Sequence, residues 1–371
     1  MVETGLGPGI VFTAVAVLYA TALARGRLDL IAVIAGPLFV VGLLFLWSWR
    51  QTRDVSTAGP GRPRGASLVA CENAEMSSAS TALDRHRAAV RARLSTAGAV
   101  RLDPCAVTWK VNREVIVIAG WGRAILLQLA HPLVAAGVAD HSSFRGSLMT
   151  RFKRLASTVG AMLSLTFGTD EEAISAAAGI NHIHDRVAGR LRERAGALEA
   201  GERYSAHDPG LVRWVHATLL ESIPLTYELL VGRLTPEERD RYCAEAAIME
   251  PLLDIPDGLL PRDSAQLDAY VREMLASGHI VVSGASRALA RAILFPPRWW
   301  LMWPAFRPLQ LITIGLLPPA IREGYGFRWS ARDARALARW TAALRLFHRV
   351  APRFLREWPA ARRPTPLSSK S

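Results

Sequence analysis

The sequence predicts an all-α fold preceded by a transmembrane helical hairpin. From Thr81 onward, apolar residues recur at helical spacing through almost the whole chain. No window shows the sustained apolar–polar alternation of a half-buried strand, apart from a weak pattern over residues 114–120. Two long uncharged runs lie within the first fifty residues. These three observations indicate a helical domain with a membrane anchor.

Composition sets the class of protein. The 371 residues are 50% hydrophobic with a mean hydropathy of +0.17, which excludes wholesale disorder and is too low for a many-pass membrane protein. The cysteines are Cys71, Cys105 and Cys243, and no two have the CxxC spacing of a zinc site. A disulfide scaffold is therefore excluded, and a reducing compartment is expected for the main domain.

The N-terminus carries the predicted hairpin, in residues 1–50. Residues 4–24 and 30–49 are each long enough to span a bilayer as a helix, and a short turn separates them. A signal peptide is disfavoured because Glu3, rather than a Lys or Arg, precedes the first run. Two core helices of a soluble domain remain the alternative.

Charge then predicts the orientation of the hairpin. Arginines are more numerous in residues 50–64, after the second run, than in the turn, so both termini and the main domain are expected in the cytoplasm. Residues 51–80 are rich in Gly, Pro, Ser and Ala and are expected to form a flexible linker. The predicted localisation is a membrane, crossed by two helices.

The main domain is predicted over residues 81–330, and helix-start signals divide it. Thr169 opens a capping box, ahead of a helix expected to reach about Ala195. Three further starts are predicted at Asp208-Pro209, Thr235-Pro236 and Asp263 or Ser264. Upstream, residues 122–140 and 151–165 are each expected to form a single helix.

A basic helical tail is predicted over residues 331–371. Residues 287–371 hold 16 of the 45 Lys and Arg residues but only 3 of the 32 acidic ones, which accounts for the net charge of +13. Arginine interspersed with tryptophan suits RNA or an anionic membrane surface. The hairpin favours the membrane, and the absence of an RNA-binding motif weighs against nucleic acid.

Histidines are the natural candidates for chemistry. His182 and His184 point about 200° apart on a regular helix, so they cannot share one metal ion. His184 falls on an apolar stripe, as either a hydrogen-bonded core residue or a ligand. A single neutral imidazole in an apolar pocket suits haem iron better than zinc, which takes three or four protein ligands. His131 and His216 would either line a cavity or hydrogen-bond in the core. The stripe is formed by Ile180, Ile183, Val187 and Leu191.

Arg154 and Thr158 form a second candidate site. They lie one helical turn apart on a face that is otherwise apolar. A guanidinium on such a face needs an anion, and a haem propionate or a catalytic carboxylate would serve. The alternative is that Arg154 reaches water beside its basic neighbours.

A series of short motifs, each weak alone, follows one order along residues 100–330. The series resembles the family that contains bacterial rubber oxygenase (latex-clearing protein) and the fungal endoplasmic-reticulum-bound oxygenase of mycophenolic acid biosynthesis. The motifs are Trp109-x4-Glu114, LLQLAHP (126–132), AGVADHSSF (136–144), Arg154-x3-Thr158, FGTDEEA (167–173), His184-x2-Val187-x-Gly189, YSAHDPGLVRWVHATL (204–219) and LLPPAIREGYGFRW (316–329).

The resemblance implies a globin-like helical core holding haem b, with His184 as the proximal iron ligand and Arg154 and Thr158 beside the haem. It also implies cleavage of an isoprenoid carbon–carbon double bond by dioxygen. Two departures stand out. Ser157 occupies the position of the family's distal lysine, and the proposed catalytic glutamate has no clear counterpart, with Asp140 nearest to its place.

The sequence therefore predicts a membrane-tethered haem b-dependent oxygenase that acts with dioxygen on an apolar small molecule or lipid. Arg154 and Thr158 are the catalytic candidates, and His184 and Arg154 the cofactor-binding ones. A non-catalytic haem- or lipid-binding membrane protein of the same fold is the alternative, supported by the two departures.

Overall fold

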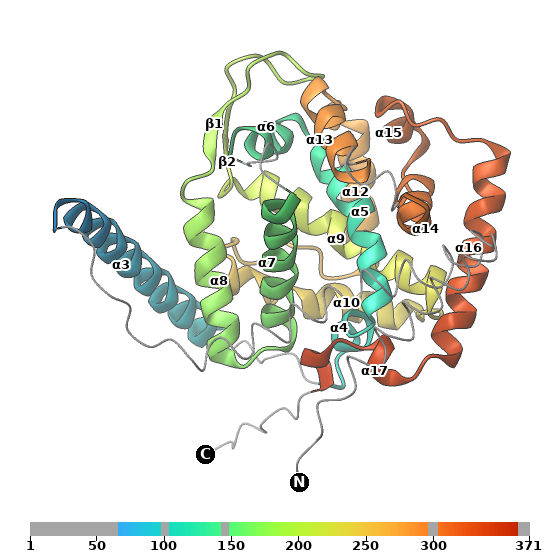
Figure 1. Ribbon diagram of the computed structural model, residues 1–371, viewed down its shortest axis with the longest axis horizontal. Coiled ribbons are helices and arrows are strands. Elements are labelled where there is room, and N and C mark those ends of the chain that lie inside the picture. The colour runs from blue at the N-terminus through green and yellow to red at the C-terminus, as the bar shows by residue number, and fades with distance from the viewer. Residues whose placement is uncertain (1–65, 98–103, 142–147, 296–302, 363–371) are drawn as a thin grey trace, which may run out of the picture.

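The computed structural model describes residues 66–97, 104–141, 148–295 and 303–362, with the backbone alone for 66–79, 148–156 and 303–305. The described chain is mostly helical, as the sequence predicts (Figure 1). The hairpin expected in residues 1–50 lies outside the described residues. The described helices are α3 (Ala66–Ala97), α4 (Val107–Asn112), η1 (Val115–Ile118), α5 (Ala119–Leu129), α6 (Pro132–His141), α7 (Leu148–Phe167), α8 (Asp170–His184), α9 (Pro209–Leu230), α10 (Pro236–Ala246), α11 (Met249–Leu252), α12 (Ser264–Ala276), α13 (Gly284–Leu294), α14 (Trp303–Gly315), α15 (Pro319–Gly324), α16 (Ala331–Val350), α17 (Arg353–Arg356) and η3 (Pro359–Arg362).

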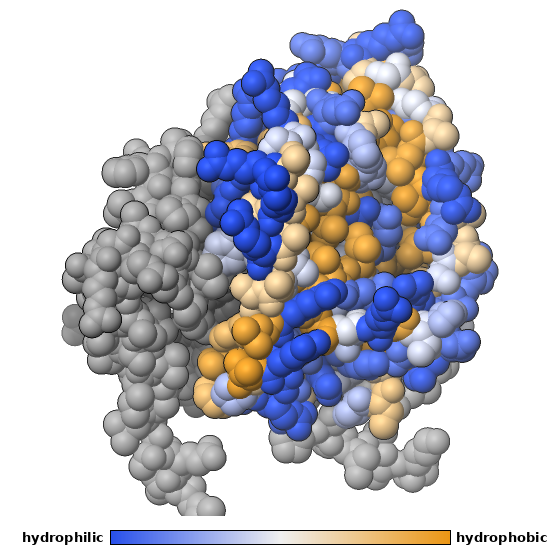
Figure 2. All heavy atoms as spheres, turned by 90° about the vertical axis from the view of Figure 1, so that its right-hand side faces the viewer, coloured by the Kyte–Doolittle hydropathy of each residue, from blue (hydrophilic) through white to orange (hydrophobic). Residues whose placement is uncertain are grey.

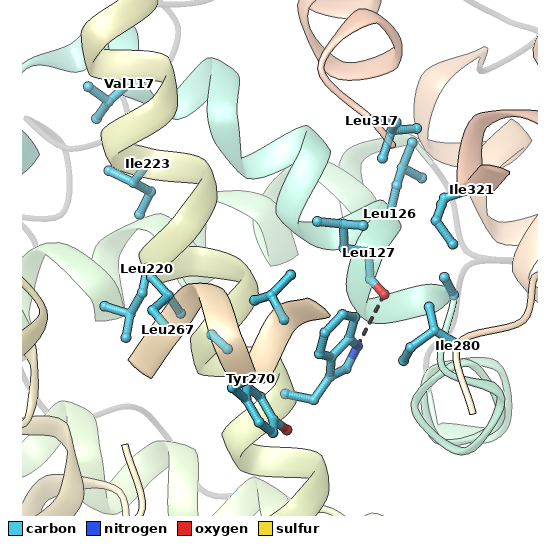
Figure 3. Close-up of a cluster of buried hydrophobic side chains, with 14 of the residues drawn as sticks. Val117, Leu126, Leu127, Leu220, Ile223, Leu267, Tyr270, Ile280, Leu317 and Ile321 are labelled. Carbon is cyan, nitrogen blue, oxygen red and sulfur yellow. Dashed lines mark hydrogen bonds between the residues drawn. The ribbon is translucent and has the colours of Figure 1, made fainter. Parts of the chain in front are cut away.

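Helices α5 and α9 pack against each other at the centre of the domain, and α14 covers α5. Their contact is the largest apolar cluster (Figure 3). Trp214 is fully buried there, and its indole N–H donates to the carbonyl oxygen of Leu127 at 3.2 Å. The buried Tyr325 hydroxyl donates to the carbonyl oxygen of Leu126 at 2.6 Å. These two bonds tie α9 and the turn after α15 to the last turn of α5.

The helix starts predicted from capping signals are confirmed. The Thr169 hydroxyl accepts from the backbone N–H of Glu172 at 3.2 Å, and the Glu172 carboxylate accepts from the N–H of Thr169 at 2.7 Å. Asp208 caps α9, Thr235 caps α10 and Asp263 caps α12 in the same local way. A capping residue and its partner are three positions apart, so this signal does not depend on the rest of the fold.

Residues 122–140 form two helices rather than the expected one. Helix α5 ends at Leu129, α6 begins at Pro132, and the axes of Val115–Leu129 and Pro132–His141 differ by 104°. Proline lacks a backbone N–H and disfavours helical geometry in the preceding residue, here His131, so the helix breaks there. Among the described residues no single helix is long and apolar enough to cross a bilayer, although this bent pair together reaches that length and composition.

The helix expected to reach Ala195 ends at His184, and a short hairpin follows. Strands β1 (Ala188–Arg190) and β2 (Arg203–Ser205) pair antiparallel, with Gly189 opposite Tyr204. Strands of three residues are too short to show an alternating pattern. The weak strand pattern over residues 114–120 is instead η1 and the start of α5.

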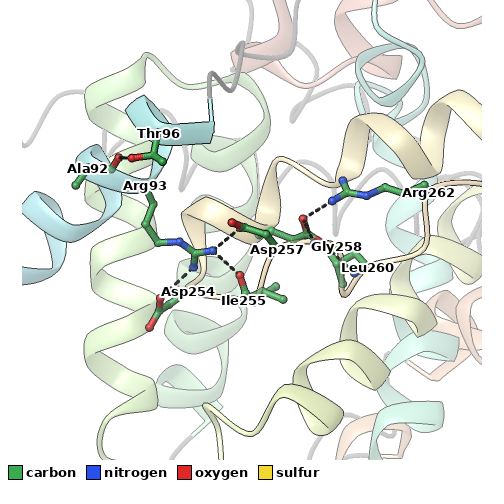
Figure 4. Close-up of polar contacts among 10 residues, drawn as sticks. Ala92, Arg93, Thr96, Asp254, Ile255, Asp257, Gly258, Leu260 and Arg262 are labelled. Carbon is green, nitrogen blue, oxygen red and sulfur yellow. Dashed lines mark hydrogen bonds and ion pairs between the residues drawn. The ribbon is translucent and has the colours of Figure 1, made fainter.

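Helix α3 begins at Ala66, inside the segment expected to be a linker, and packs along α8 (Figure 1). Its Arg93 reaches the loop after α11 (Figure 4). The guanidinium contacts the carboxylates of Asp254 at 3.0 Å and Asp257 at 2.7 Å, and donates to the carbonyl oxygen of Ile255 at 2.7 Å. This cluster holds α3 against the domain.

The C-terminal segment is helical over α16, as predicted, and packs onto the start of the domain. His348 donates to Glu114 at 2.7 Å, and both side chains are buried. Arg113 Nε lies 3.6 Å from a carboxylate oxygen of Glu114 and 3.6 Å from one of Glu357. The backbone N–H of Trp358 donates to the carbonyl oxygen of Arg113 at 2.9 Å. Glu114, within a motif of the family resemblance, therefore anchors the C-terminal segment.

The surface on the α16 side of the molecule mixes apolar and hydrophilic side chains (Figure 2). Three of the large exposed apolar side chains lie four residues apart, two near the end of α16 and one in α17, which follows after the extended residues Ala351 and Pro352. They are Leu346, Val350 and Phe354, which are 62%, 73% and 47% exposed. Arginines at 345, 349 and 353 alternate with them.

Candidate functional site

Histidines from three helices gather where α8 ends and α9 begins. Asp185, directly after α8, lies between two of them. Its carboxylate accepts from Nε2 of His86 at 2.7 Å and from Nε2 of His207 at 2.9 Å. Burial alone would raise the pKa of Asp185, but these two hydrogen bonds outweigh it and hold the pKa below its usual range. The other members of the group are His182 and His184 on α8 and His216 on α9.

His184 and His216 are half-buried and neutral at pH 7. Burial lowers the pKa of His184 to about 4, and His207 lowers it further while Asp185 opposes the change. Burial also lowers the pKa of His216 to about 4, with a further contribution from His184. Neither imidazole forms a hydrogen bond with another described residue. A neutral imidazole with a free lone pair is the form that binds iron.

Helix geometry correctly predicted that His184 and His182 point in different directions, but the prediction of which face of the helix is buried was wrong. Ile183, expected on the buried stripe, is 54% exposed. His182, expected on the wetter face, is half-buried because α3 packs there, and its ring centroid lies 6.3 Å from that of His86. His184 instead packs against His207, edge to face, at 5.8 Å between ring centroids.

Arg154 and Thr158, the other predicted site residues, both lie on α7. Helices α7 and α8 pack against each other, and only Gly168 and Thr169 connect them (Figure 1). So short a connection makes the pair antiparallel, which brings the first half of α7 level with the last turns of α8. Thr158 is exposed and the side chain of Arg154 is not described, so the structure relates Arg154 to His184 by backbone position only.

Asp140 has a structural role. Its carboxylate accepts from the Tyr204 hydroxyl at 2.8 Å and from Arg192 at 2.6 Å. Burial and the bond to Asp140 raise the pKa of Tyr204 to about 12. The motif residues Gly137 and Gly189 both face this ring, and a Cβ on Gly189 would clash with its hydroxyl. These residues fix the β1–β2 hairpin against α6.

His131 is a core residue, one of the two alternatives left open for it. It is 5% exposed, its Nδ1 accepts from the backbone N–H of Leu133 at 3.3 Å, and its ring stacks on His279 with centroids 6.5 Å apart. The residues that sequence reasoning missed are His86 and His207, together with Asp185, which binds both. His207 directly precedes the helix cap Asp208, which fixes its place at the start of α9, whereas no pattern connects His86 to residues about a hundred positions away.

Comparison with known proteins places the chain in a family. Residues 109–346 match the family model described as the catalytic domain of the ER-bound oxygenase mpaB/B′ and rubber oxygenase. The chain belongs to this family. The resemblance predicted from the motifs is thereby confirmed, and the family is one of oxygenases.

Two mycobacterial relatives match over the same length. They are the uncharacterized protein Mb2261 of Mycobacterium bovis and the uncharacterized protein Rv2237 of Mycobacterium tuberculosis. Each is 27% identical over 232 residues, which cover 62% of this chain and 87% of the relative. No solved structure matches the chain.

The matched region divides the histidine group. His182, His184, His207 and His216 lie within residues 109–346, whereas His86 lies before it on α3. The family domain therefore contains the neutral imidazoles of His184 and His216. Helix α3, which precedes the domain, adds the imidazole of His86 to the same group of histidines.

Proposed function

We propose that the protein is a membrane-tethered haem b-dependent oxygenase that uses dioxygen to cleave or oxygenate an apolar, isoprenoid-like compound. One observation carries the proposal. In a chain of an oxygenase family, the half-buried His184 is neutral and forms no hydrogen bond with another described residue. Its lone pair is not committed to another described residue, and a neutral imidazole of this kind suits haem iron as a ligand.

The residues at the end of α8 fit a haem. His184 would bind the iron, and the neighbouring His216 is neutral as well, so it would bring no charge to the site. Attachment would be non-covalent, because the sequence has no CxxCH motif. Haem, when bound, supplies the activation of dioxygen, and the protein supplies the ligand, its orientation and the electrostatics.

The remaining roles fall to residues of this chain. His207 packs edge to face on His184, and the bond from His207 to Asp185 fixes that contact, so the His184 ring is held in one orientation. We assign Arg154 to the carboxylates of the cofactor, where a fixed positive charge offsets theirs. Thr158, one turn further along α7, is assigned a catalytic role as a hydroxyl donor.

Membrane attachment is proposed from two parts of the chain. The uncharged runs in residues 1–50 would form the hairpin. The exposed apolar side chains of α16 and α17, flanked by arginines, would rest on an anionic lipid surface. An apolar substrate partitions into the same lipid, so the anchor would bring the enzyme to it.

A second candidate, haem or lipid binding without turnover, has support of its own. Ser157 stands where the family has a lysine, and Asp140, the residue nearest to the catalytic glutamate, is already bonded to Tyr204 and Arg192. Oxygen consumption in the presence of isoprenoid lipids distinguishes the two functions. A protein that only binds would hold haem, but adding the lipid would not increase its oxygen consumption.

The test of the haem site is the visible absorption spectrum of the purified full chain and of two variants. His184→Ala removes the assigned ligand, and His182→Ala removes an imidazole from another face of the same helix. We expect the Soret band to be lost or shifted in His184→Ala, with partial recovery in free imidazole, and unchanged in His182→Ala. A colourless wild-type protein, or the wild-type spectrum in both variants, would refute the assignment.

A further inference from the structure

His86, His182 and Asp185 form a compact group of metal-ligand atoms distinct from the face of α8 that carries His184. One nitrogen of each histidine and one carboxylate oxygen all lie within 4.8 Å of one another. Asp185 still has helical backbone angles (φ −53°, ψ −28°), so it lies on the same face of the helix as His182, three residues earlier. His86 approaches this face from α3. We propose that these three residues bind a divalent transition-metal ion, for which zinc is the probe.

The donor set selects this class of metal. Two imidazoles and one carboxylate suit zinc and iron(II), whereas magnesium and calcium prefer oxygen ligands alone. Three protein ligands with one open position are the arrangement of zinc sites that keep a bound water. The side chains of His86 and Asp185 are 24% and 44% exposed, which leaves a route for the ion and room for that water.

The polar atoms around the group are arranged as a metal would require. Nδ1 of His182 is shielded from solvent and has no hydrogen-bond partner in the described part of the chain. The second oxygen of Asp185 is held by Nε2 of His207 at 2.9 Å, the kind of outer contact that orients a ligating carboxylate. A buried histidine nitrogen without a partner and a carboxylate already oriented by a histidine are both compatible with an ion bound by this group.

For the closest pair of ligand atoms, the change in geometry on binding is small. Nε2 of His86 and Oδ2 of Asp185 are 2.7 Å apart, joined by a proton. Ligand bonds of about 2.0 Å at a tetrahedral angle place two ligand atoms about 3.3 Å apart. Replacing the proton by the ion therefore separates this pair by less than about 1 Å, within the reach of side-chain adjustment.

The site would connect α3 to the family domain. His86 lies before the matched residues 109–346, and His182 and Asp185 lie within them. The bonds from Arg93 to the loop after α11 already hold α3 in position, so the ligands are brought together before the ion arrives (Figure 4). A bound ion would add a direct link between α3 and the end of α8.

The test is zinc binding by the full chain in detergent, after removal of bound metal with a chelator that leaves haem in place. Titration with Zn²⁺ against a chromophoric zinc chelator should give one site per chain, and Mg²⁺ in excess should not displace the ion. His86→Ala and His182→Ala should each weaken zinc binding at least tenfold. His141→Ala, which removes an exposed histidine on α6, is the matched control and should bind as the wild type does.

The outcome is independent of the haem proposal. His86→Ala changes a residue of α3 that faces solvent in part, and circular dichroism and a wild-type haem spectrum would show that the fold is kept. The His184→Ala variant should bind zinc normally while its haem spectrum changes, and His182→Ala should show the reverse. Zinc bound with wild-type affinity by a folded His86→Ala variant, or no zinc bound by the wild type, would overturn the site.

Discussion

Replacing His131 by Asn should remove one contribution to the pH dependence of stability. Burial, aided by the neighbouring His279, lowers the pKa of this imidazole to about 4, against the opposing effects of Asp208 and Glu202. The Nδ1 atom accepts a backbone N–H two residues along the chain, which an imidazolium cannot do. An asparagine oxygen accepts the same kind of bond, so the variant keeps the local contact and loses the titrating group.

The size and sign follow from the two pKa values. Above pH 6.5 the histidine is neutral in both the folded and the unfolded chain and adds no slope. Between pH 6.5 and about 4 the unfolded chain takes up a proton that the folded chain does not, so the free energy of unfolding falls as pH falls. The loss is about 1.4 kcal/mol per pH unit, or about 3 kcal/mol across the window.

The assay is urea denaturation of the wild type and of His131→Asn at half-unit intervals from pH 4 to 7.5. The difference between their unfolding free energies should be constant above pH 6.5 and should change in favour of the variant below it. The comparison also cancels the contributions of His184 and His216, whose pKa values are lowered to about 4 as well. Parallel pH profiles for the two proteins would mean that His131 is not held neutral by burial.

Three other changes test the packing and the surface. His348→Ala should cost about 3 kcal/mol, because it leaves the Glu114 carboxylate buried without its hydrogen-bond donor, and a much smaller loss in thermal or urea unfolding would contradict this. Gly189→Ala should cost about 1–3 kcal/mol, because the new Cβ would meet both the hydroxyl and the ring carbons of Tyr204 and the ring would have to move, and urea unfolding at wild-type stability would contradict this. In the protein lacking residues 1–50, Val350→Glu should reduce the fraction that sediments with anionic vesicles, while the free energy of unfolding changes by less than about 0.5 kcal/mol. An unchanged sedimenting fraction would show that the C-terminal helices do not bind the membrane.

What the sequence predicted well depends on local signals. Thr169, Asp208, Thr235 and Asp263 mark helix starts because each caps backbone groups within three residues of itself. The opposite orientations of His182 and His184 follow equally from helix geometry alone. Such features require no knowledge of which elements pack together.

What the sequence did not predict depends on contacts between distant segments. His182 is half-buried because α3 covers it, and the sequence around residue 182 does not predict a contact with a helix that begins at Ala66. The role of Asp185 likewise depends on His86, about a hundred residues away. Pro132 alone indicates a helix break, but the apolar pattern continues across it, so the sequence does not show that the helix axis changes direction there.

The buried ionic cluster of Arg113, Glu114, His348 and Glu357 shows that the folded domain extends beyond the residues matched by the family model. The family match ends at residue 346, two residues before His348 and well before Glu357. A protein cut at that boundary would keep Glu114 and Arg113 with their partners removed, and their charges would face a newly opened apolar surface. A stable fragment of the protein should therefore include all residues through 362, because the partners of the buried charges lie beyond residue 346.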